Sequence, residues 1–444
     1  MDLKDLASDI LERCRRAGAT DAEVALSDGR QSELEVRDGA VDRLVAGQPR
    51  SVSIRVWQGD RSAAGTATDL GAGAVDRLIR DAMDLIPLTD PVPEQALPEA
   101  AWLATELPDL DLHDPRIEAL GPDERIELIR RAEAAAMAAD ARVSISGGAG
   151  WSDASSTQVL ANSRGFLGAV TGGWASLYVE VIANDTDHRK RNGAWSSVAR
   201  FLEDLEEPEQ VGERAARRAV GMLGAGPIPT ERLPVVFDPH AGASLLGSLF
   251  QVISGSAVER GASFLSDAVG TVIASPLVTV VDDPHRRRGL GSRPFDGEGL
   301  PTRETVFVER GTLKQLALSC YHARRLHLTP TGHATGSGGE KPSNLYLAPG
   351  TTPREELIAG VRRGFYCESM MGFGFNPSTG DYSRGASGYL IEDGQLTRPV
   401  SEVTLSSTLG EILSGIDAVG DELIFDRSVV APSFRVASMT LAGT

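Results

Sequence analysis

The stretch 388-GYLIEDGQLTR-398 gives the clearest indication of how this chain folds. Apolar and polar residues alternate along it, and the alternation reverses about a glycine turn at Gly394. A second stretch, 305-TVFVERGTLKQ-315, alternates about Gly311 in the same way. These hairpins predict antiparallel sheet. A doubly wound nucleotide-binding fold is disfavoured, because the long alternation of strands and helices that it needs is missing.

The N-terminal part predicts a helix followed by an antiparallel meander. Apolar residues recur at helical spacing from Leu3 to Cys14, and Gly18 follows as a stop signal. Short alternating runs then predict strands, and a second helix fits residues 72–86. The pattern returns further on, with helices expected at 123–139 and 209–223. The strands expected between them cover 142–146, 157–162, 165–171 and 175–183.

The fold class that we predict is α+β, with two N-terminal helix-plus-antiparallel-meander units and a larger C-terminal domain dominated by antiparallel β-sheet. Seven of the 24 prolines fall within residues 87–122, a composition typical of an extended linker. We therefore divide the chain into a first unit (1–90), a Pro-rich linker (91–114), a second unit (115–228) and a C-terminal domain (229–444). Further strands are expected at 403–405, 423–425 and 435–441, and a short helix at 408–416.

Charge and cysteine usage narrow the functional classes. The formal net charge of −18 repels nucleic-acid phosphates and anionic lipid, so we expect neither as a partner. No window is apolar enough to span a membrane. Cys14, Cys320 and Cys367 are widely spaced and form no metal or disulfide pattern, which is typical of a reducing cytoplasm. The charged N-terminus does not resemble a signal peptide.

The motifs of conventional enzymes are missing. None of the seven histidines is followed by Glu, so no H-E-x-x-H helix is present. The nucleophile elbow G-x-S-x-G and the Walker lysine are also missing. Cys367 lies near glycine-rich motifs, but no histidine that could orient it is identifiable, and a buried structural thiol is the favoured interpretation.

One cluster of polar residues remains as a candidate binding site, in 376-NPSTGDYSRGASGYL-390. Asp381, Ser383 and Arg384 follow turn residues and enter a predicted strand. The small residues at 385–388 would let another backbone approach closely, as peptide binding by strand addition requires. The alternative is a glycine-bearing hairpin in which Asp381 and Arg384 pair locally.

The same residues carry a family resemblance. The stretch 376-NPSTGDYSRGASGYLIEDGQLTRPVSEVTL-405 resembles the C-terminal signature of the TldD/PmbA family, on its TldE (PmbA) side. Three more blocks resemble the family in the same order along the chain: 37-RDGAVDRLVAGQPRSVSIRVWQGDR-61, 289-GLGSRPFDGEGLPTRETVFVERGTLK-314 and 331-TGHATGSGGEKPSNLYLAPG-350.

The resemblance implies a cytosolic heteromer of TldD-type and TldE-type subunits that acts as a metallopeptidase on unfolded or modified peptides. In the TldD-type partner, a helix carrying H-E-x-x-x-H and a late cysteine hold zinc, and the Glu can activate the bound water. The family's older label is modulator of DNA gyrase. A direct role on gyrase or DNA has little physical support in a chain this acidic.

In this chain the positions that correspond to the zinc site hold other residues. The helix expected within 240-HAGASLLGSLFQVISG-255 has Gly247 and Ser248 at the His–Glu positions and Val252 at the second His position. Ala386 stands at the late cysteine position. We expect His240 to lie before this helix and to replace no ligand. The resemblance therefore implies no catalytic zinc or other cofactor in this chain, with zinc confined to a TldD-type partner.

We therefore predict a metal-free, TldE/PmbA-like subunit that contacts a TldD-type zinc peptidase and helps to enclose a peptide cleft. The residues that we expect to bind the peptide are Asn344, Asp381, Ser383, Arg384 and Ser387. Two alternatives stay open. One is a stand-alone peptide-binding homodimer without catalysis, and the other is an independent hydrolase that uses Cys367 or Ser387.

Overall fold

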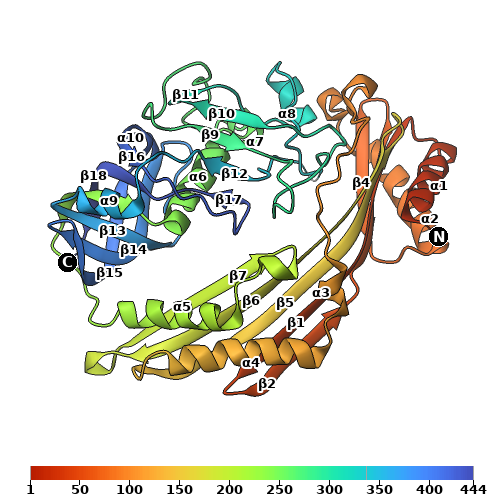
Figure 1. The fold of residues 1–444 in the computed structure, drawn as a ribbon. Helices are drawn as coiled ribbons and strands as arrows, with labels where there is room; N and C mark the ends of the chain where they lie inside the picture. The colour runs from red at the N-terminus through yellow and green to blue at the C-terminus, as the bar shows by residue number, and fades with distance from the viewer. Residues whose placement is uncertain (1, 337, 444) are drawn as a thin grey trace.

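The N-terminal half of the computed structural model, which describes residues 2–336 and 338–443, is built on one long curved sheet (Figure 1). In sheet order its strands are β4 (Arg61–Ala67), β3 (Arg50–Gln58), β1 (Asp21–Arg37), β5 (Val143–Asn162), β6 (Leu167–Asn184) and β7 (Lys190–Ala199), and β2 (Ala40–Gly47) pairs with β1 alone. The central pairing is antiparallel, from Glu23 opposite Asn162 to Val36 opposite Ala149. The two predicted meanders thus share one sheet.

The predicted helices are confirmed as α1 (Leu3–Arg16), α2 (Ala72–Leu85), α4 (Pro122–Ala138) and α5 (Pro208–Gly221); α3 (Pro115–Ala119) is a single short turn. The predicted strand boundaries are wrong in the second meander. Residues 142–146 and 157–162 belong to one strand, β5, and residues 165–171 and 175–183 belong to β6. The intervening small residues are held extended because β5 is paired along both edges, so tertiary pairing overrides their weak strand preference.

Alternation along β1 separates the two faces of this sheet. Ala22, Val24, Leu26, Leu34 and Val36 are buried on one face, where α1 and α2 pack near one end and α4 and α5 near the other. The odd-numbered residues point to the opposite face, which Figure 1 shows turned toward the C-terminal half. That second face carries mostly small and polar side chains, so it is not a core face.

Close backbone contact places α5 against both α4 and β7. A Cβ atom added at Gly212 would lie 2.1 Å from the carbonyl oxygen of Ala132 in α4, and one added at Gly193 would lie 2.2 Å from the backbone nitrogen of Ala219 in α5. Neither glycine has a positive φ. Glycine is therefore needed at both positions for the close approach of two backbones rather than for a turn.

A buried ion pair fastens α4 to the sheet. Arg125 of α4 is 5% exposed and Asp153 of β5 is 2% exposed, with 3.1 Å between Nη1 and Oδ2. Trp151 Nε1 also donates to Asp153 Oδ2 over 2.9 Å, and the Ser32 hydroxyl donates to the same oxygen. The carboxylate thus has one ion pair and two hydrogen bonds, from three elements, which offset the cost of burying its charge.

The linker region, residues 91–114, crosses between the two halves in irregular backbone with short 3₁₀ turns at Pro93–Gln95 and Ala100–Trp102. The guanidinium of Arg324 holds it in place by donating to the backbone oxygens of Glu94, Ala96 and Leu97. No helix among the described residues combines the length and apolar character needed to cross a membrane.

The C-terminal half contains two further sheets. The five-stranded sheet has the order β11 (Thr312–Leu313), β10 (Thr305–Glu309), β9 (Val280–Asp282), β12 (Leu345–Leu347) and β17 (Val429–Val430). The six-stranded sheet has the order β15 (Gln395–Thr408), β14 (Asp381–Glu392), β13 (Arg363–Met371), β8 (Glu231–Phe237), β18 (Phe434–Ala442) and β16 (Ile416–Val419). Helices α7 (Gly255–Glu259), α8 (Cys320–Arg325), α9 (Arg354–Ala359) and α10 (Leu409–Ser414) connect these strands.

Both predicted hairpins are confirmed, as β10–β11 and β14–β15. In the second, Asp393 and Gly394 both have positive φ, as a tight hairpin turn requires. Most pairings are antiparallel, and the α+β class is confirmed, although β13–β8 and β12–β17 pair in parallel. The strand predicted at 423–425 is wrong, because these apolar residues lie in irregular backbone.

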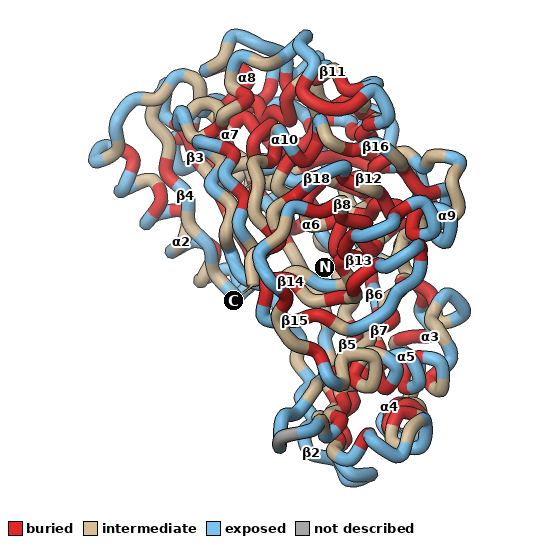
Figure 2. The backbone as a smooth tube through the Cα atoms, turned by 90° about the vertical axis from the view of Figure 1, so that its left-hand side faces the viewer, coloured by how far each residue is buried: buried red, intermediate tan, exposed pale blue. Residues whose placement is uncertain are grey.

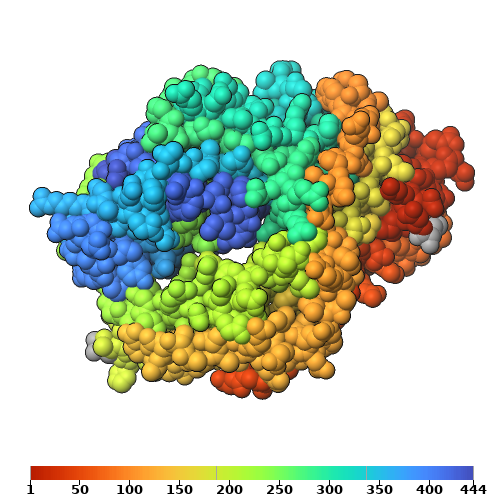
Figure 3. Space-filling model, viewed as in Figure 1, coloured from red at the N-terminus to blue at the C-terminus, as the bar shows by residue number. Residues whose placement is uncertain are grey.

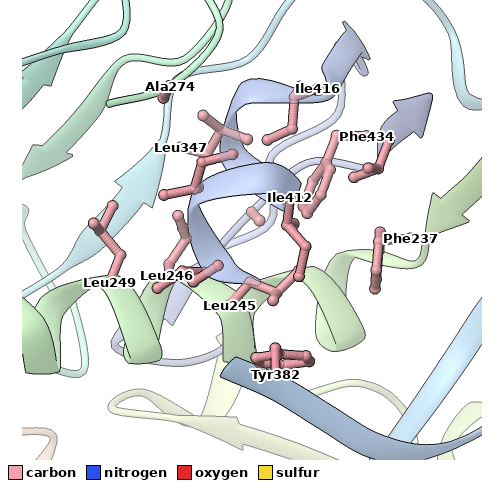
Figure 4. Packing of buried hydrophobic residues seen from close by; sticks show 14 of the residues in the cluster. Phe237, Leu245, Leu246, Leu249, Ala274, Leu347, Tyr382, Ile412, Ile416 and Phe434 are labelled. Carbon is pink, nitrogen blue, oxygen red and sulfur yellow. The ribbon is translucent and has the colours of Figure 1, made fainter. Parts of the chain in front are cut away.

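The core of the C-terminal half surrounds the helix α6 (Pro239–Val252). Figure 4 shows Leu245, Leu246 and Leu249 of this helix among apolar side chains from both sheets and from α10. Phe237 of β8 and Phe434 of β18 stack with their ring centroids 5.1 Å apart. Figure 2 shows buried positions gathered around α6, whereas β2 is exposed along almost its whole length.

Candidate functional site

The helix α6 is the element that the sequence singles out for function. Pro239 occupies its first position and Asp238 caps it by accepting a hydrogen bond from the backbone N–H of His240 over 3.0 Å. His240 therefore lies in the first turn of the helix, and the expectation that it precedes the helix is wrong. The Asp-Pro pair before it was the sequence signal for this earlier start.

The four positions that the family resemblance assigns to a zinc site do not form a ligand set here. Gly247 is exposed and has no neighbouring atom within 4 Å of an added Cβ. The Ser248 hydroxyl donates to the carbonyl oxygen of Ser244, while Val252 and Ala386 are buried in the apolar core. These side chains offer no imidazole, thiolate or carboxylate, so they do not fit a zinc ion.

Elsewhere too, the part of the chain that the structure describes contains no group of three or more His, Cys, Asp and Glu residues suited to hold a metal ion.

The predicted peptide-binding residues do not gather in one place. Asp381, Ser383, Arg384 and Ser387 lie on β14, but the strand's alternation sends Arg384 to one face and the other three to the opposite face. Asp381 and Arg384 consequently do not pair. Asp381 instead accepts a hydrogen bond from the Thr379 hydroxyl over 2.6 Å.

Arg384 points toward α6. Its Nη1 donates to the hydroxyl of Ser244 over 3.2 Å and lies 3.4 Å from the hydroxyl of Tyr382. Its Nε is buried and has no hydrogen-bond partner among the described residues. Ser244 lies one helical turn before Gly247 and Ser248, so a fixed positive charge lies beside the part of α6 where the family's metal ligands would be.

Strand addition at residues 385–388 is excluded, and that prediction is wrong. Both edges of β14 are already used, by β13 on one side and β15 on the other. The small residues instead accommodate the neighbouring strand: a Cβ at Gly388 would lie 1.9 Å from the carbonyl oxygen of Tyr366, next to the bulge in β13.

Asn344 lies in a different part of the domain, immediately before β12. It is 1% exposed, and its amide is occupied by its own chain. Oδ1 accepts from the backbone N–H of Gly291 over 3.0 Å, and Nδ2 donates to the carbonyl oxygen of Asp283 and the hydroxyl of Ser292. Asn344 therefore holds the loop at 289–292 against the strand, and its binding role stays a prediction.

The two candidate nucleophiles differ in accessibility. Cys367 is fully buried, and this burial, with the nearby Asp238 carboxylate, raises the pKa of its thiol far above the usual range, so the reactive thiolate does not form at neutral pH. Ser387 is partly accessible, but no hydrogen bond from its hydroxyl to a histidine is present among the described residues. Neither arrangement matches an activated nucleophile.

A polar cluster at the start of α6 has no counterpart in the sequence predictions. His240 Nε2 lies 2.6 Å from Asp426 Oδ2, its Nδ1 lies 3.3 Å from Asp238 Oδ1, and Tyr366 donates to the other oxygen of Asp238. The ring of Trp195 packs edge-on against His240. A cavity of about 500 Å³ opens here between α5 and the C-terminal half.

Burial on its own would lower the pKa of His240, but the hydrogen bonds to the Asp238 and Asp426 carboxylates outweigh it, so the pKa of the imidazole is raised. The same contacts, acting against burial, lower the pKa values of Asp238 and Asp426. The two carboxylates therefore favour the protonated form of the His240 imidazole between them. Sequence could not reveal it, because Asp426 is 186 residues from His240.

We expect His240→Gln to lower stability more at pH 6 than at pH 9. The folded pKa lies above the unfolded value of about 6.5, so the stabilisation is fully present below that pH and is lost as the pH rises through the folded pKa. A loss of about 1–2 kcal/mol at pH 6 is expected from hydrogen bonds to a charged group. Urea denaturation followed by circular dichroism at both pH values measures it; an equal loss at both would contradict the assignment.

Comparison with known proteins supports one family along the whole chain. Residues 22–86 match the model for PmbA/TldA metallopeptidase domain 1, residues 115–223 match the central domain, and residues 230–443 match the C-terminal domain. The metalloprotease PmbA of Escherichia coli O157:H7 is 33% identical over 99% of this chain and 96% of its own length. A PmbA homologue from Haemophilus influenzae is 29% identical, again over 96% of its length.

Solved structures agree in fold. A crystal structure from Bacteroides thetaiotaomicron, whose name proposes a modulator of DNA gyrase, superposes with a TM-score of 0.93 at 26% identity and covers 99% of both chains. TldE from Thermococcus kodakarensis has a TM-score of 0.88 at 22% identity, covering 99% of this chain and all of its own. With three consecutive domain models matched and a third of the residues shared with PmbA, the chain belongs to the PmbA/TldD family of metallopeptidases.

Proposed function

We propose that this chain is the metal-free, TldE-like subunit of a two-chain peptidase, in which a TldD-type partner supplies the zinc and the catalytic base. The observation that carries the proposal is the combination of a complete family fold with Gly247, Ser248, Val252 and Ala386 at the ligand and base positions. A catalytic zinc site needs three protein ligands and an open position. This chain keeps the scaffold of such a site without its chemistry.

Arg384 supports the same conclusion. Its guanidinium is bound to Ser244 on α6, beside the turn that holds Gly247 and Ser248. A divalent cation placed there would be repelled by this positive charge in a partly buried environment, where charges are poorly screened. The same guanidinium can meet a carboxylate of a peptide or of the partner subunit instead.

The residues that we propose to bind the peptide lie mainly on β14. Asp381, Ser383 and Ser387 point away from α6, where carboxylate and hydroxyl groups can satisfy the backbone of an extended peptide. We propose that these residues line a cleft that is closed by the partner, and that Asn344 contributes by holding the loop at 289–292. The three unpaired cysteines, all buried, are consistent with a cytoplasmic setting.

The test is reconstitution with a TldD-type protein from the same genome. We expect the purified chain to contain substoichiometric zinc and to show no peptidase activity on an unfolded polypeptide such as reduced casein. We expect the co-purified pair to contain zinc and to cleave the substrate until a chelator is added. Arg384→Ala should weaken pair formation or peptide turnover, and Arg80→Ala, an exposed arginine of α2, serves as its control.

Other outcomes would favour the alternatives. Stoichiometric zinc in the isolated chain would overturn the proposal. Chelator-resistant turnover by the isolated chain, lost in Ser387→Ala, would indicate an independent hydrolase. A stable homodimer that binds peptide but neither cleaves it nor joins a TldD-type chain would indicate a stand-alone binding protein.

A further inference from the structure

A cavity lies between the second face of the N-terminal sheet and the loops of the C-terminal half. It has a volume of about 560 Å³. A second cavity of about 550 Å³ adjoins it along the sheet, and the two share Ser27, Gln158, Val170, Arg293 and Lys341 as lining residues. Figure 3 shows the molecule hollowed between its N-terminal and C-terminal halves. Each volume is in the range of pockets that bind small molecules or short peptides.

The first cavity is lined by positive charge only. Arg30, Arg200, Arg293 and Lys341 are its charged residues, and no Asp or Glu side chain lines it among the described residues. This is unexpected in a protein with a net charge of −18. Arg30 lies 3.4 Å from Glu118, and Arg200 donates to four backbone carbonyl oxygens, including those of Gly289 and Leu290. These two arginines are therefore engaged within the protein.

Arg293 and Lys341 are different, because no carboxylate lies within ion-pair distance of either among the described residues. Arg293 Nη2 donates to the backbone oxygen of Lys341 over 2.8 Å, which holds the two residues side by side. Its Nε and Nη1 are buried without a hydrogen-bond partner. Burial lowers the pKa of both side chains, and the neighbouring guanidinium lowers that of Lys341 further. Asp282 and Asp296 attract Arg293 and partly offset the cost of its burial, but neither forms an ion pair with it, so the two adjacent cations have no directly contacting carboxylate.

We propose that Arg293 and Lys341 form a binding site for the terminal carboxylate of a short extended peptide lying along this face of the sheet. A guanidinium and an ammonium side by side suit the two oxygens of a carboxylate. Serine and threonine side chains along β1, β3, β4 and β5 can bind the rest of the peptide backbone.

The charged residues that line the adjoining cavity agree with a peptide whose carboxylate end lies at Arg293 and Lys341. The charged lining residues of this second cavity are Glu23, Arg55, Arg293, Asp296 and Lys341, so the acidic groups of the combined groove all lie in it. A peptide whose carboxylate lies in the first cavity, at Arg293 and Lys341, would direct its amino end toward the acidic groups of the second cavity. That the ligand is a peptide rests on the proposed function; the anion site itself rests only on the charges described here.

The experiment measures binding of an N-acetylated alanine tetrapeptide, as the free acid and as the C-terminal amide, to the full chain by calorimetry at fixed ionic strength. We expect the free acid to bind and the amide to bind roughly 10- to 100-fold more weakly, as loss of charge-assisted hydrogen bonds predicts. We expect Arg293→Met and Lys341→Met to lose the preference for the acid. Arg80→Met, on the exposed surface of α2, should keep it.

Stability provides a second measurement. Lys341 is exposed and Arg293 is half-buried, so both Met variants should fold and melt close to the wild-type temperature. Equal affinity for acid and amide, or an unchanged preference in the folded Met variants, would overturn the proposal. Inorganic phosphate that binds as tightly as the peptide acid and displaces it would overturn the peptide assignment. None of these results depends on a partner subunit, so this proposal can fail or succeed independently of the reconstitution experiment that tests the proposed function.

Discussion

Asp153→Ala is expected to lower the free energy of unfolding of the N-terminal sheet by about 3–5 kcal/mol, because it leaves the buried Arg125 guanidinium without its carboxylate. The Trp151 indole and the Ser32 hydroxyl lose their acceptor in the same substitution. Four of the five tryptophans of the chain lie in strands of this sheet and Trp102 lies in the linker, so tryptophan fluorescence during urea denaturation reports mainly on this sheet. A midpoint shifted to much lower urea is the expected observation.

Two controls test whether the loss of stability comes from leaving one buried charge unpaired. Arg142 and Asp140 form a surface ion pair with 2.7 Å between Nη2 and Oδ2, and Arg142→Ala should shift the urea midpoint far less than Asp153→Ala. The double variant Arg125→Met/Asp153→Leu removes both buried charges together and should be much less harmful than Asp153→Ala. If Asp153→Ala costs no more than Arg142→Ala, the ion pair does not fasten α4 to the sheet.

Gly193→Ala is expected to be the most damaging single-methyl addition to the sheet. The new Cβ would lie 2.2 Å from the backbone nitrogen of Ala219 and 2.4 Å from the backbone oxygen of Ala215. Backbone atoms cannot rotate away, so α5 must move off β7 as a unit. We expect a loss of about 3 kcal/mol or more, the upper part of the range for overpacking.

The shift of α5 has its own signature. Arg218 of α5 lies over the ring of Trp195 with 4.5 Å between its Cζ and the ring centroid, so Trp195 emission should change in the folded variant. Gly73→Ala in α2 is the matched control, because no atom lies within 4 Å of its added Cβ. In a helix this change should stabilise by about 0.5–1 kcal/mol. Similar losses in both variants would argue against the close α5–β7 contact.

The elements predicted from sequence are those whose signals are local. The hairpin at Gly394 and the helix α2 depend on a turn residue and on spacing within a few residues, and both are confirmed. The length of β5 was missed because its middle is rich in small residues, and its extended form depends on β1 and β6. The apolar run at 423–425 was mistaken for a strand, since apolar character alone does not supply a pairing partner.

The candidate site shows the same limit. Family resemblance located α6 and the residues that it assigns to the zinc positions, but the separation of Arg384 from Asp381 on opposite faces of β14 was not predicted. The His240 cluster and the pair of Arg293 and Lys341 depend on residues brought together from distant parts of the chain. Arg293 and Lys341 each lie in a glycine-rich loop that resembles the family. A basic residue within such a loop was the only signal of this pair in the sequence.

The pairing of β1 with β5 also has a consequence for synthesis on the ribosome. The edge of β1 that pairs with β5 stays unpaired until residue 162, the end of β5, has been made. That is 125 residues after β1 itself ends at residue 37. At translation rates of about 5–20 residues per second, that interval is roughly 6–25 s. During it the nascent chain exposes a long unpaired strand, and we expect a chaperone that shields such edges to raise the yield of folded protein during synthesis.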